Sequence, residues 1–258
     1  MNDALYVAAT GLFAHQSNVE TIANNVANLN TPTYKKSKVS FQDMIYREAA
    51  KGERTQPLET ADYRGTGVLA TVVGKDFTQG DVKATGSSLD LAIQGSGFIE
   101  VVLADGSAAY SRGGTLHVGD DGVLGLADGH ALKSAISIPT DAKTISISAT
   151  GEVSATTSSG KQESVGTLDM VLFSAPQDLV PIGDNLYRAS DASGTPISAS
   201  ATEDGAGQFV QGSLEMSNVS MVDEMVALMV AQRAYEMSAK VLQAADDMSS
   251  LSNNLSRS

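Results

Sequence analysis

Three histidines are the side chains best suited to act as a general base near neutral pH, because imidazole titrates in that range. His15 falls on a helical apolar pattern, which favours packing over catalysis. His117 lies in a strand-like alternation, and His130 follows a turn-forming Asp-Gly pair. None has a serine, cysteine or carboxylate at a spacing that resembles a nucleophilic site. We therefore predict no catalytic residues and no enzyme.

Two short motifs suggest an ion or phosphate site, and each has a simpler explanation. Gly119-Asp120-Asp121-Gly122 lacks the further oxygen ligands and the closing glutamate of a calcium loop, so we interpret it as a hairpin turn. Gly95-Ser96-Gly97 lacks the Lys-Ser/Thr of a phosphate-binding loop, and its glycines fit a β-bulge or close packing. The chain has no cysteine, which excludes disulfides and cysteine-based metal sites. We predict no metal and no cofactor.

Length and charge limit the kinds of partner. The chain has 258 residues, 42% of them hydrophobic, which is enough for one or two domains with a sizeable core. It carries 17 basic and 30 acidic residues, a net charge of −13, which disfavours nucleic acid and anionic membranes. The longest apolar run, Met225 to Ala231, is far shorter than the ~20 residues of a membrane span. The first residues do not resemble a secretory signal, so we expect a chain that is soluble or is exported without a cleaved leader.

The first thirty residues predict an amphipathic helix. Apolar side chains recur at heptad spacing in two rows: Leu5, Leu12, Val19 and Val26, then Ala8, His15, Ile22 and Leu29. This spacing is typical of a coiled-coil seam. Asn2 or Asp3 can cap the start, and Pro32 ends the helix because the residue before a proline disfavours helical geometry.

A second helix is predicted from Met221 onward. Its heptad rows are Met221, Leu228, Tyr235 and Leu242, then Met225, Gln232 and Ala239. Ser220, or the pair Ser217-Asn218, can cap its start. From Met221 to Ala231 the helix is apolar almost all the way round, so it has to be buried on all sides. One partner helix cannot do this alone.

The middle of the chain indicates antiparallel β structure. Leu89, Leu91 and Ile93 alternate with other residues, and Asp-Gly and Gly-Gly pairs recur between such runs, without a βαβ rhythm. The expected fold is α+β, with long N- and C-terminal amphipathic helices forming a coiled-coil-like inner domain and a mainly antiparallel β middle domain. The expected segments are an N-terminal helix at 1–34, an extended or β connection at 35–75, a β-rich outer domain at 76–212 and a C-terminal helix at 213–258.

Charge is unevenly distributed along the chain. Residues 35–54 contain six basic and three acidic residues, a local charge of +3, whereas residues 141–258 contain six basic and 15 acidic residues, a charge of −9. This asymmetry favours contact between the basic segment of one copy and the acidic surface of another, and a solvated loop explains it equally well. The candidates for such contacts are Lys35, Lys36 and Lys38.

Four asparagines crowd the end of the first helix: Asn24, Asn25, Asn28 and Asn30. Asparagine is a poor helix former, but its amide both donates and accepts hydrogen bonds. A ring of such residues suits a helix end that meets neighbouring helices. A simple C-cap is the alternative, and it needs one asparagine rather than four.

Several stretches together resemble bacterial flagellar rod and hook proteins. They are LYVAATGL at 5–12, IANNVANLNTP at 22–32, Tyr34-Lys35, SLDLAIQGSGF at 88–98, QGSLEMSNV at 211–219 and QRAYE at 232–236, which includes Gln232 and Arg233. The length, the start Ala8-Ala9-Thr10-Gly11 and Gly65-Thr66-Gly67-Val68 look most like the distal rod protein, with the proximal rod protein as the alternative. Two departures from the family pattern are Pro32-Thr33, where many relatives carry a glycine, and Gly113-Gly114.

The resemblance implies a function as well as an architecture. The terminal helices would line the inner tube of an axial assembly, with the β domain outside it. The implied function is a structural subunit of the flagellar basal-body rod, which crosses the periplasm and transmits torque. The implied partners are further copies of the chain, other rod proteins, hook-side axial proteins, the surrounding ring bushing and the flagellar export apparatus. A β module that binds an envelope polymer is the alternative from another class.

Overall fold

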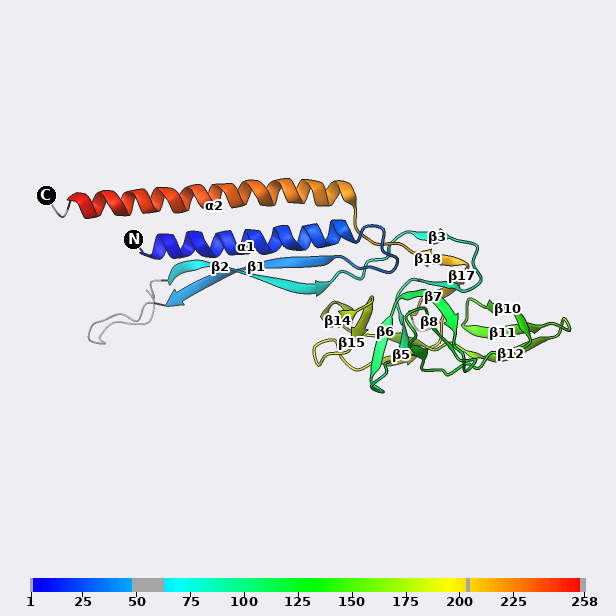
Figure 1. Cartoon of the computed structure of the whole chain (residues 1–258). Helices are drawn as coiled ribbons and strands as arrows, with labels where there is room; N and C mark the ends of the chain where they lie inside the picture. Colours follow the sequence, from blue (N-terminus) through cyan, green and yellow to red (C-terminus); the bar gives the residue numbers. More distant parts are fainter. Residues whose placement is uncertain (1, 48–62, 203–204, 256–258) are drawn as a thin grey trace, which may run out of the picture. The chain divides into compact units, whose positions relative to one another are not determined.

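The structure, a computed structural model, describes residues 2–47, 63–202 and 205–255. The described chain has one long helix near each end and eighteen strands between them. Every strand pairing whose register is resolved is antiparallel. The expected α+β fold, with a helix at each end and a mainly antiparallel β middle, is therefore confirmed (Figure 1).

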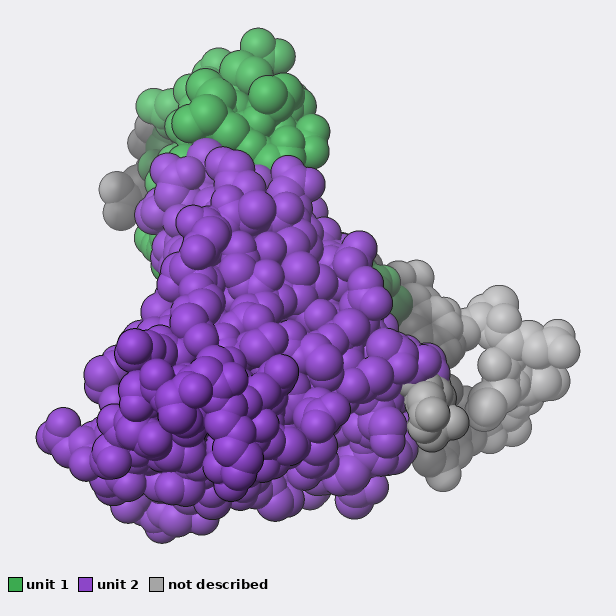
Figure 2. Space-filling model, turned by 90° about the vertical axis from the view of Figure 1, so that its right-hand side faces the viewer, with its two compact units in different colours: residues 1–26, 37–73, 220–258 green, residues 27–36, 74–219 purple. Residues whose placement is uncertain are grey.

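The chain divides into two compact units, coloured in Figure 2. Unit 1 contains residues 1–26, 37–73 and 220–258, and unit 2 contains residues 27–36 and 74–219. The chain thus passes from one unit to the other four times. The four segment boundaries expected from the sequence stay a prediction.

Unit 1 consists of two helices and a β ribbon. Helix α1 spans Asn2–Ala27, helix α2 spans Met221–Leu255, and strands β1 (Ser37–Arg47) and β2 (Tyr63–Lys75) pair with each other. Figure 1 shows α1 lying between α2 and the ribbon. Within the described residues, neither helix has a stretch long and apolar enough to cross a membrane.

Hydrogen bonds and charged side chains stabilise the start of α2 and the end of α1. Ser220 caps α2, because its Oγ accepts a hydrogen bond from the backbone N–H of Asp223 at 3.5 Å. Asp223 and Glu224 place negative charge in the first turn, where the helix dipole favours it. After α1, the Thr31 hydroxyl and backbone N–H both donate to Asn28, at 3.2 Å each, in the turn that ends the helix.

Unit 2 is built from β3 to β18. The strands are β3 (Val82–Ala84), β4 (Asp90–Gln94), β5 (Phe98–Val102), β6 (Ala108–Ser111), β7 (Gly113–Val118), β8 (Leu124–Leu126), β9 (Ala131–Leu132), β10 (Ala142–Ile147), β11 (Glu152–Thr157), β12 (Gln162–Thr167), β13 (Met170–Leu172), β14 (Val180–Gly183), β15 (Leu186–Arg188), β16 (Ile197–Ala199), β17 (Gln208–Gln211) and β18 (Ser213–Glu215), with a short 3-10 helix at Pro176–Asp178. The main sheet follows the order β14-β15-β6-β5-β9-β8-β7-β4-β17, and β13 pairs with β5 and β16. Strands β10-β11-β12 form a second sheet and β18-β3 a third.

Apolar side chains of these strands form two hydrophobic cores in unit 2. The larger core contains Leu91, Ile93 and Leu116, which are fully or almost fully buried. The smaller core includes aromatic side chains that meet edge to face, with ring centroids 4.8–6.4 Å apart: Phe77, Phe98, Tyr110, Phe173 and Tyr187. A chain without tryptophan therefore gathers much of its aromatic surface in one buried place.

Backbone geometry is unusual at both departures from the family pattern. Thr33 is buried at φ 61°, in the left-handed region that favours glycine, and its N–H donates to the Glu215 carbonyl oxygen at 2.7 Å. Gly113 has φ 107°, and a Cβ there would overlap the Leu91 carbonyl oxygen of the paired strand. Gly113 is therefore needed for close strand packing.

Candidate functional site

Small side chains form the contact between the helices of unit 1. The buried residues of α1 include Ala8, Ala14 and Ile22, and those of α2 include Ala231 and Ala245. A Cβ added at Gly11 of α1 would lie 3.6 Å from the Ser238 hydroxyl of α2. Small residues at these positions let the two helices approach closely, whereas Met221, Met225 and Met229 of α2 are more than half exposed.

Strand β2 is fixed to α1 by two of the family signature stretches. The Thr10 hydroxyl donates to the Val7 carbonyl oxygen at 2.8 Å and accepts from the Val68 N–H at 3.3 Å. Gly67 has φ 123°, and a Cβ there would overlap the Thr10 hydroxyl. In the sequence these two stretches were only separate motifs shared with the family, whereas the structure shows that they contact each other.

The opposite side of α2 is an apolar surface that the described chain does not cover. Six side chains over its first turns are between 50% and 71% exposed: Met221, Val222, Met225, Val226, Met229 and Val230. We call these six residues the α2 apolar face. Exposed patches of contiguous apolar side chains mark interaction sites, so this face is the candidate interaction surface of unit 1.

The predicted seam residues fall into two groups in the isolated chain. Ile22 is buried, and the half-buried residues are Leu5, Leu12, Val19, Val26, Leu29, Leu228 and Leu242. Met221, Met225 and Tyr235 are 51%, 54% and 42% exposed. Whether any of them meets another subunit stays a prediction.

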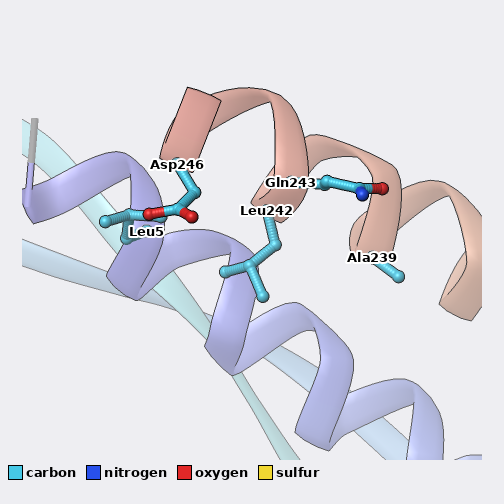
Figure 3. Close-up of a pocket in the computed structure, with 5 residues that line it drawn as sticks. All are labelled: Leu5, Ala239, Leu242, Gln243 and Asp246. Atoms are coloured by element: carbon cyan, nitrogen blue, oxygen red, sulfur yellow. The ribbon is translucent and has the colours of Figure 1, made fainter. Parts of the chain in front are cut away.

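A shallow groove of about 400 Å³ runs between α1 and α2 near the C-terminal end of α2 (Figure 3). Its lining combines two predicted seam residues with three further residues of α2: Leu5, Leu242, Ala239, Gln243 and Asp246. The groove is open to solvent, so the two helices do not cover each other completely at this end.

Asn25 acts as both donor and acceptor within unit 1. It is 2% exposed, its Oδ1 accepts from the Ser37 N–H at 2.9 Å, and its Nδ2 donates to the Ser37 carbonyl oxygen at 3.0 Å. The same amide nitrogen lies 3.4 Å from Oε2 of Glu224 on α2. One amide thus joins α1, β1 and α2. The asparagine cluster had suggested either contacts with neighbouring helices or a C-cap of α1, and neither interpretation includes these contacts within unit 1.

The other signature residues are more accessible. Asn24 and Asn30 are exposed, and Asn28 is half-buried. Gln232 and Arg233 are exposed on α2. A role for these side chains in contacts between subunits stays a prediction.

A buried ion cluster gathers distant segments of unit 2. Glu215 is fully buried; its Oε1 accepts from Lys35 Nζ at 2.6 Å and from the Gly80 N–H at 3.0 Å. Its Oε2 accepts from Arg112 Nε at 3.2 Å and Nη2 at 3.1 Å. We call Lys35, Arg112 and Glu215 the Glu215 cluster. It joins the segment after α1, the loop after β2, the β6–β7 connection and β18.

Backbone oxygens complete the cluster, because it contains two cations and one anion. Lys35 Nζ also donates to the Thr78 carbonyl oxygen at 2.7 Å. Arg112 donates to the carbonyl oxygens of Gly97 at 2.6 Å and Ile93 at 3.2 Å. Burial lowers the pKa of Lys35 below its usual value, and the negative charge of Glu215 opposes that shift.

This position changes the expectation for Lys35. Its side chain is fully buried and paired within its own unit, so it is not available to a neighbouring subunit, and we remove it from the contact candidates. Lys36 is half-buried and Lys38 is exposed, and the prediction stays for these two. The rest of the basic segment, from residue 48 to 54, lies outside the described residues.

Asn218 ties the same segments together. Its Oδ1 accepts from the Lys36 N–H at 2.9 Å, and its Nδ2 donates to the carbonyl oxygens of Asp76 at 2.7 Å and Thr78 at 3.1 Å. Glu215 and Asn218 both lie in the signature stretch at 211–219. The sequence therefore contained a signal for these two residues, whereas Arg112 lies outside the signature stretches.

The three histidines of the chain differ in their surroundings. The ring of His15 lies 5.8 Å from that of Phe41, His117 is exposed on β7, and His130 is half-buried after a turn. Among the described residues, no three His, Asp or Glu side chains lie close enough together to hold a metal ion.

Comparison with known proteins gives three family matches. Residues 5–35 match the flagella basal body rod protein family, residues 92–155 the flagellar hook protein FlgE/F/G D1 domain, and residues 210–255 the flagellar basal body rod FlgEFG protein C-terminal family. The basal-body rod protein FlgG of Agrobacterium fabrum is 40% identical over 98% of this chain and 99% of its own. In Caulobacter vibrioides, FlgG is 39% identical over 95% of this chain and 96% of its own, and FlgF is 32% identical over 96% of each.

Terminal helices with an antiparallel β middle, matched in these three places, define the class of flagellar axial proteins. The chain belongs to the FlgG family of flagellar basal-body rod proteins. It is a structural subunit of the rod in the flagellar basal body. The resemblance to the distal rather than the proximal rod protein is confirmed, since FlgG exceeds FlgF in identity within one organism.

Proposed function

We propose that this subunit joins the rod by burying the α2 apolar face against helices of neighbouring copies. In this arrangement the terminal helices form a coiled-coil-like inner tube, and the β-rich unit 2 lies outside it. The subunit serves as part of the axial shaft that transmits torque from motor to hook, and it performs no catalysis.

The observation that carries this proposal is the exposure of the α2 apolar face. The buried side of α2 includes Glu224 and the small residues Ala231 and Ala245. Its other side presents methionine and valine to water over the first turns, where Val222 is 71% exposed. Such a face is stable only when other helices cover it.

The size of the effect indicates how much of the subunit takes part. Full burial of a methionine or valine side chain contributes about 1.5–3 kcal/mol, so covering the exposed half of six of them contributes about 5–9 kcal/mol. Association costs about 4–15 kcal/mol in lost freedom of motion. The α2 apolar face therefore needs support from further contacts. The half-buried seam residues of α1, and Phe13, which is 73% exposed, are the proposed source.

The remaining expectations become proposals about partners. Lys36 and Lys38 are proposed to contact an acidic surface of a neighbouring subunit or the ring bushing. The family implies assembly with other rod and hook components. We propose proximal rod proteins and hook-side axial proteins as neighbours, export through the flagellar apparatus without a cleaved signal peptide, and a position where the rod crosses the periplasm.

Binding of an envelope polymer by unit 2 is less well supported. Sugar-binding surfaces usually present aromatic rings to solvent. In unit 2, Phe98, Tyr110 and Tyr187 are at most 3% exposed and pack against one another. These rings are therefore not available to stack on a sugar.

The test is one substitution on the face and one matched control. Val226→Asp places a charge on the α2 apolar face, and Ser250→Asp places the same charge on an exposed polar position of the same helix, about 120° away around its axis. Each variant replaces the native gene in the flagellated host. We expect Val226→Asp to yield a folded subunit with normal circular dichroism but no rods in isolated basal bodies, and Ser250→Asp to yield rods. Normal rods and motility with Val226→Asp would contradict the proposal.

A further inference from the structure

The reactive sulfur of this chain is concentrated on one helix. The chain has nine methionines and no cysteine. Met170 is fully buried in unit 2, and Met44 and Met216 are half-buried. All five methionines of α2 are more than half exposed: Met221 (51%), Met225 (54%), Met229 (53%), Met237 (67%) and Met248 (61%).

Three of these side chains form a row. Met221, Met225 and Met229 recur at intervals of four residues, which places them one above the other on a helix. All three belong to the α2 apolar face. The nearest other members of that face are valines, Val222 and Val226, whose side chains contain no hydrogen-bond donor.

We propose that Met221, Met225 and Met229 form an oxidation site that controls whether the subunit can be added to the rod. The site accepts a peroxide-class oxidant in the free subunit and is protected once neighbouring helices cover it. This inference rests on the proposed function, because it needs the α2 apolar face to be the surface that assembly buries.

The chemistry is a two-electron oxygen transfer. A thioether lone pair attacks one oxygen of hydrogen peroxide, the O–O bond breaks, and a new S–O bond forms. The second oxygen leaves as water after proton transfer, so sulfur is oxidised and the peroxide is reduced. No group of the protein is required as a catalyst, and accessibility alone selects the sulfur.

Oxidation changes the property on which packing depends. Methionine is flexible and apolar, and it adapts to irregular neighbouring surfaces. Its sulfoxide is polar and carries an oxygen that must accept a hydrogen bond when buried. The valines beside the row cannot donate that bond, so an oxidised row that is buried finds no donor side chain among them, and this opposes association of the face.

Accessibility is measured first, on the full-length free subunit and on basal bodies isolated from cells. Both are treated with hydrogen peroxide, and each methionine is followed by peptide mass spectrometry. We expect the row to oxidise at least about tenfold faster than Met170 in the free subunit, and at least about tenfold more slowly in rods than in the free subunit. Equal rates in rods and free subunit would overturn the proposed burial of the face. A row as slow as Met170 in the free subunit would overturn the oxidation site alone.

The consequence for assembly is measured in cells with two triple variants. Replacing all three residues by leucine keeps the row apolar and removes the sulfur, whereas replacing them by glutamine imitates the polarity of the sulfoxide. We expect cells with the leucine variant to be motile. They should still build rods at peroxide doses that reduce the number of rods at least about tenfold in wild-type cells, and a tenfold change corresponds to about 1.4 kcal/mol. Glutamine cells should lack rods.

The outcomes separate the inference from the proposed function. If leucine cells build rods but lose them at the same peroxide dose as wild-type cells, the oxidation site is wrong and the assembly face stands. If glutamine cells build normal rods, the face tolerates polarity, and both the site and the proposed function are wrong.

Discussion

Glu215→Gln provides the sharpest test of the account of unit 2. The substitution keeps the shape of the side chain and removes the negative charge that pairs with both Lys35 and Arg112. Both cations are at most 3% exposed, so water cannot replace the lost partner. Removing one partner of a buried ion pair costs about 3–5 kcal/mol. At about 2–4 °C per kcal/mol for a domain of this size, the melting temperature of unit 2 should fall by about 6–20 °C.

Two control variants make the reasoning refutable. Glu100→Gln breaks the ion pair with Lys133, which is 62% exposed, and should cost no more than about 1 kcal/mol. Lys35→Met leaves Glu215 paired with Arg112 in a balanced pair, and should cost about 1–3 kcal/mol. Each protein is unfolded by heat and, separately, in urea, and both transitions are followed by tyrosine fluorescence. If Lys35→Met lowers the free energy of unfolding as much as Glu215→Gln or more, the charge balance assigned to the Glu215 cluster is refuted.

Further predictions concern unit 1 and the response to alkaline pH. Gly67→Ala should destabilise unit 1 by about 1–3 kcal/mol, because the positive φ of Gly67 and its contact with Thr10 leave no room for a Cβ. Gly65→Ala is the control: a Cβ at Gly65 meets no atom within 4 Å, so stability should change by less than about 1 kcal/mol. Thermal melts by circular dichroism measure both variants. Because burial lowers the pKa of Lys35, the unfolded chain binds more protons than the folded chain between that pKa and 10.5. The free energy of unfolding should therefore rise with pH in this window more steeply in the wild type than in Lys35→Met. Equal slopes of unfolding free energy against pH for the two proteins, measured by urea titration, would contradict this. Burial raises the pKa of Tyr187, so the folded chain retains a proton that the unfolded chain loses above pH 10, and stability should fall there in the wild type but less in Tyr187→Phe.

Periodicity in the sequence was sufficient to predict the helices and the β middle. The heptad rows through Leu5 and Leu12, and the alternation through Leu91 and Ile93, each report the local backbone, because side-chain direction repeats with the period of the element. The Ser220 cap was among the predicted caps for the same reason: its partner is three residues away. These signals are local, so a single sequence can contain them.

The contact between α1 and α2 was harder to predict, because it is made by small residues. Glu224, Ala231 and Ala245 lie on one heptad row and are all buried. A search for apolar periodicity favours the row of Met221 and Leu228 instead, since larger side chains carry more of the hydrophobic signal. In the isolated chain those larger methionine side chains are exposed.

The Glu215 cluster could not be derived from local patterns. Glu215 lies 180 residues from Lys35 and 103 residues from Arg112, so no spacing connects them. Charged residues are usually exposed, so the sequence alone favours a surface position for Lys35. Only the fold, which brings the segment after α1 beside β18, reveals that this lysine is buried.

The most direct test of the central claim is the accessibility of the α2 apolar face before and after assembly. Because the chain has no cysteine, Val226→Cys introduces the only thiol, and Ser250→Cys provides a matched control at an exposed polar position of the same helix. Each variant is treated with a small maleimide as a free subunit and in isolated basal bodies. We predict that Cys at 226 reacts rapidly in the free subunit and is protected at least about tenfold in the rod, as expected for a buried helix contact. Equal labelling in both states would contradict the assignment of this face to rod assembly.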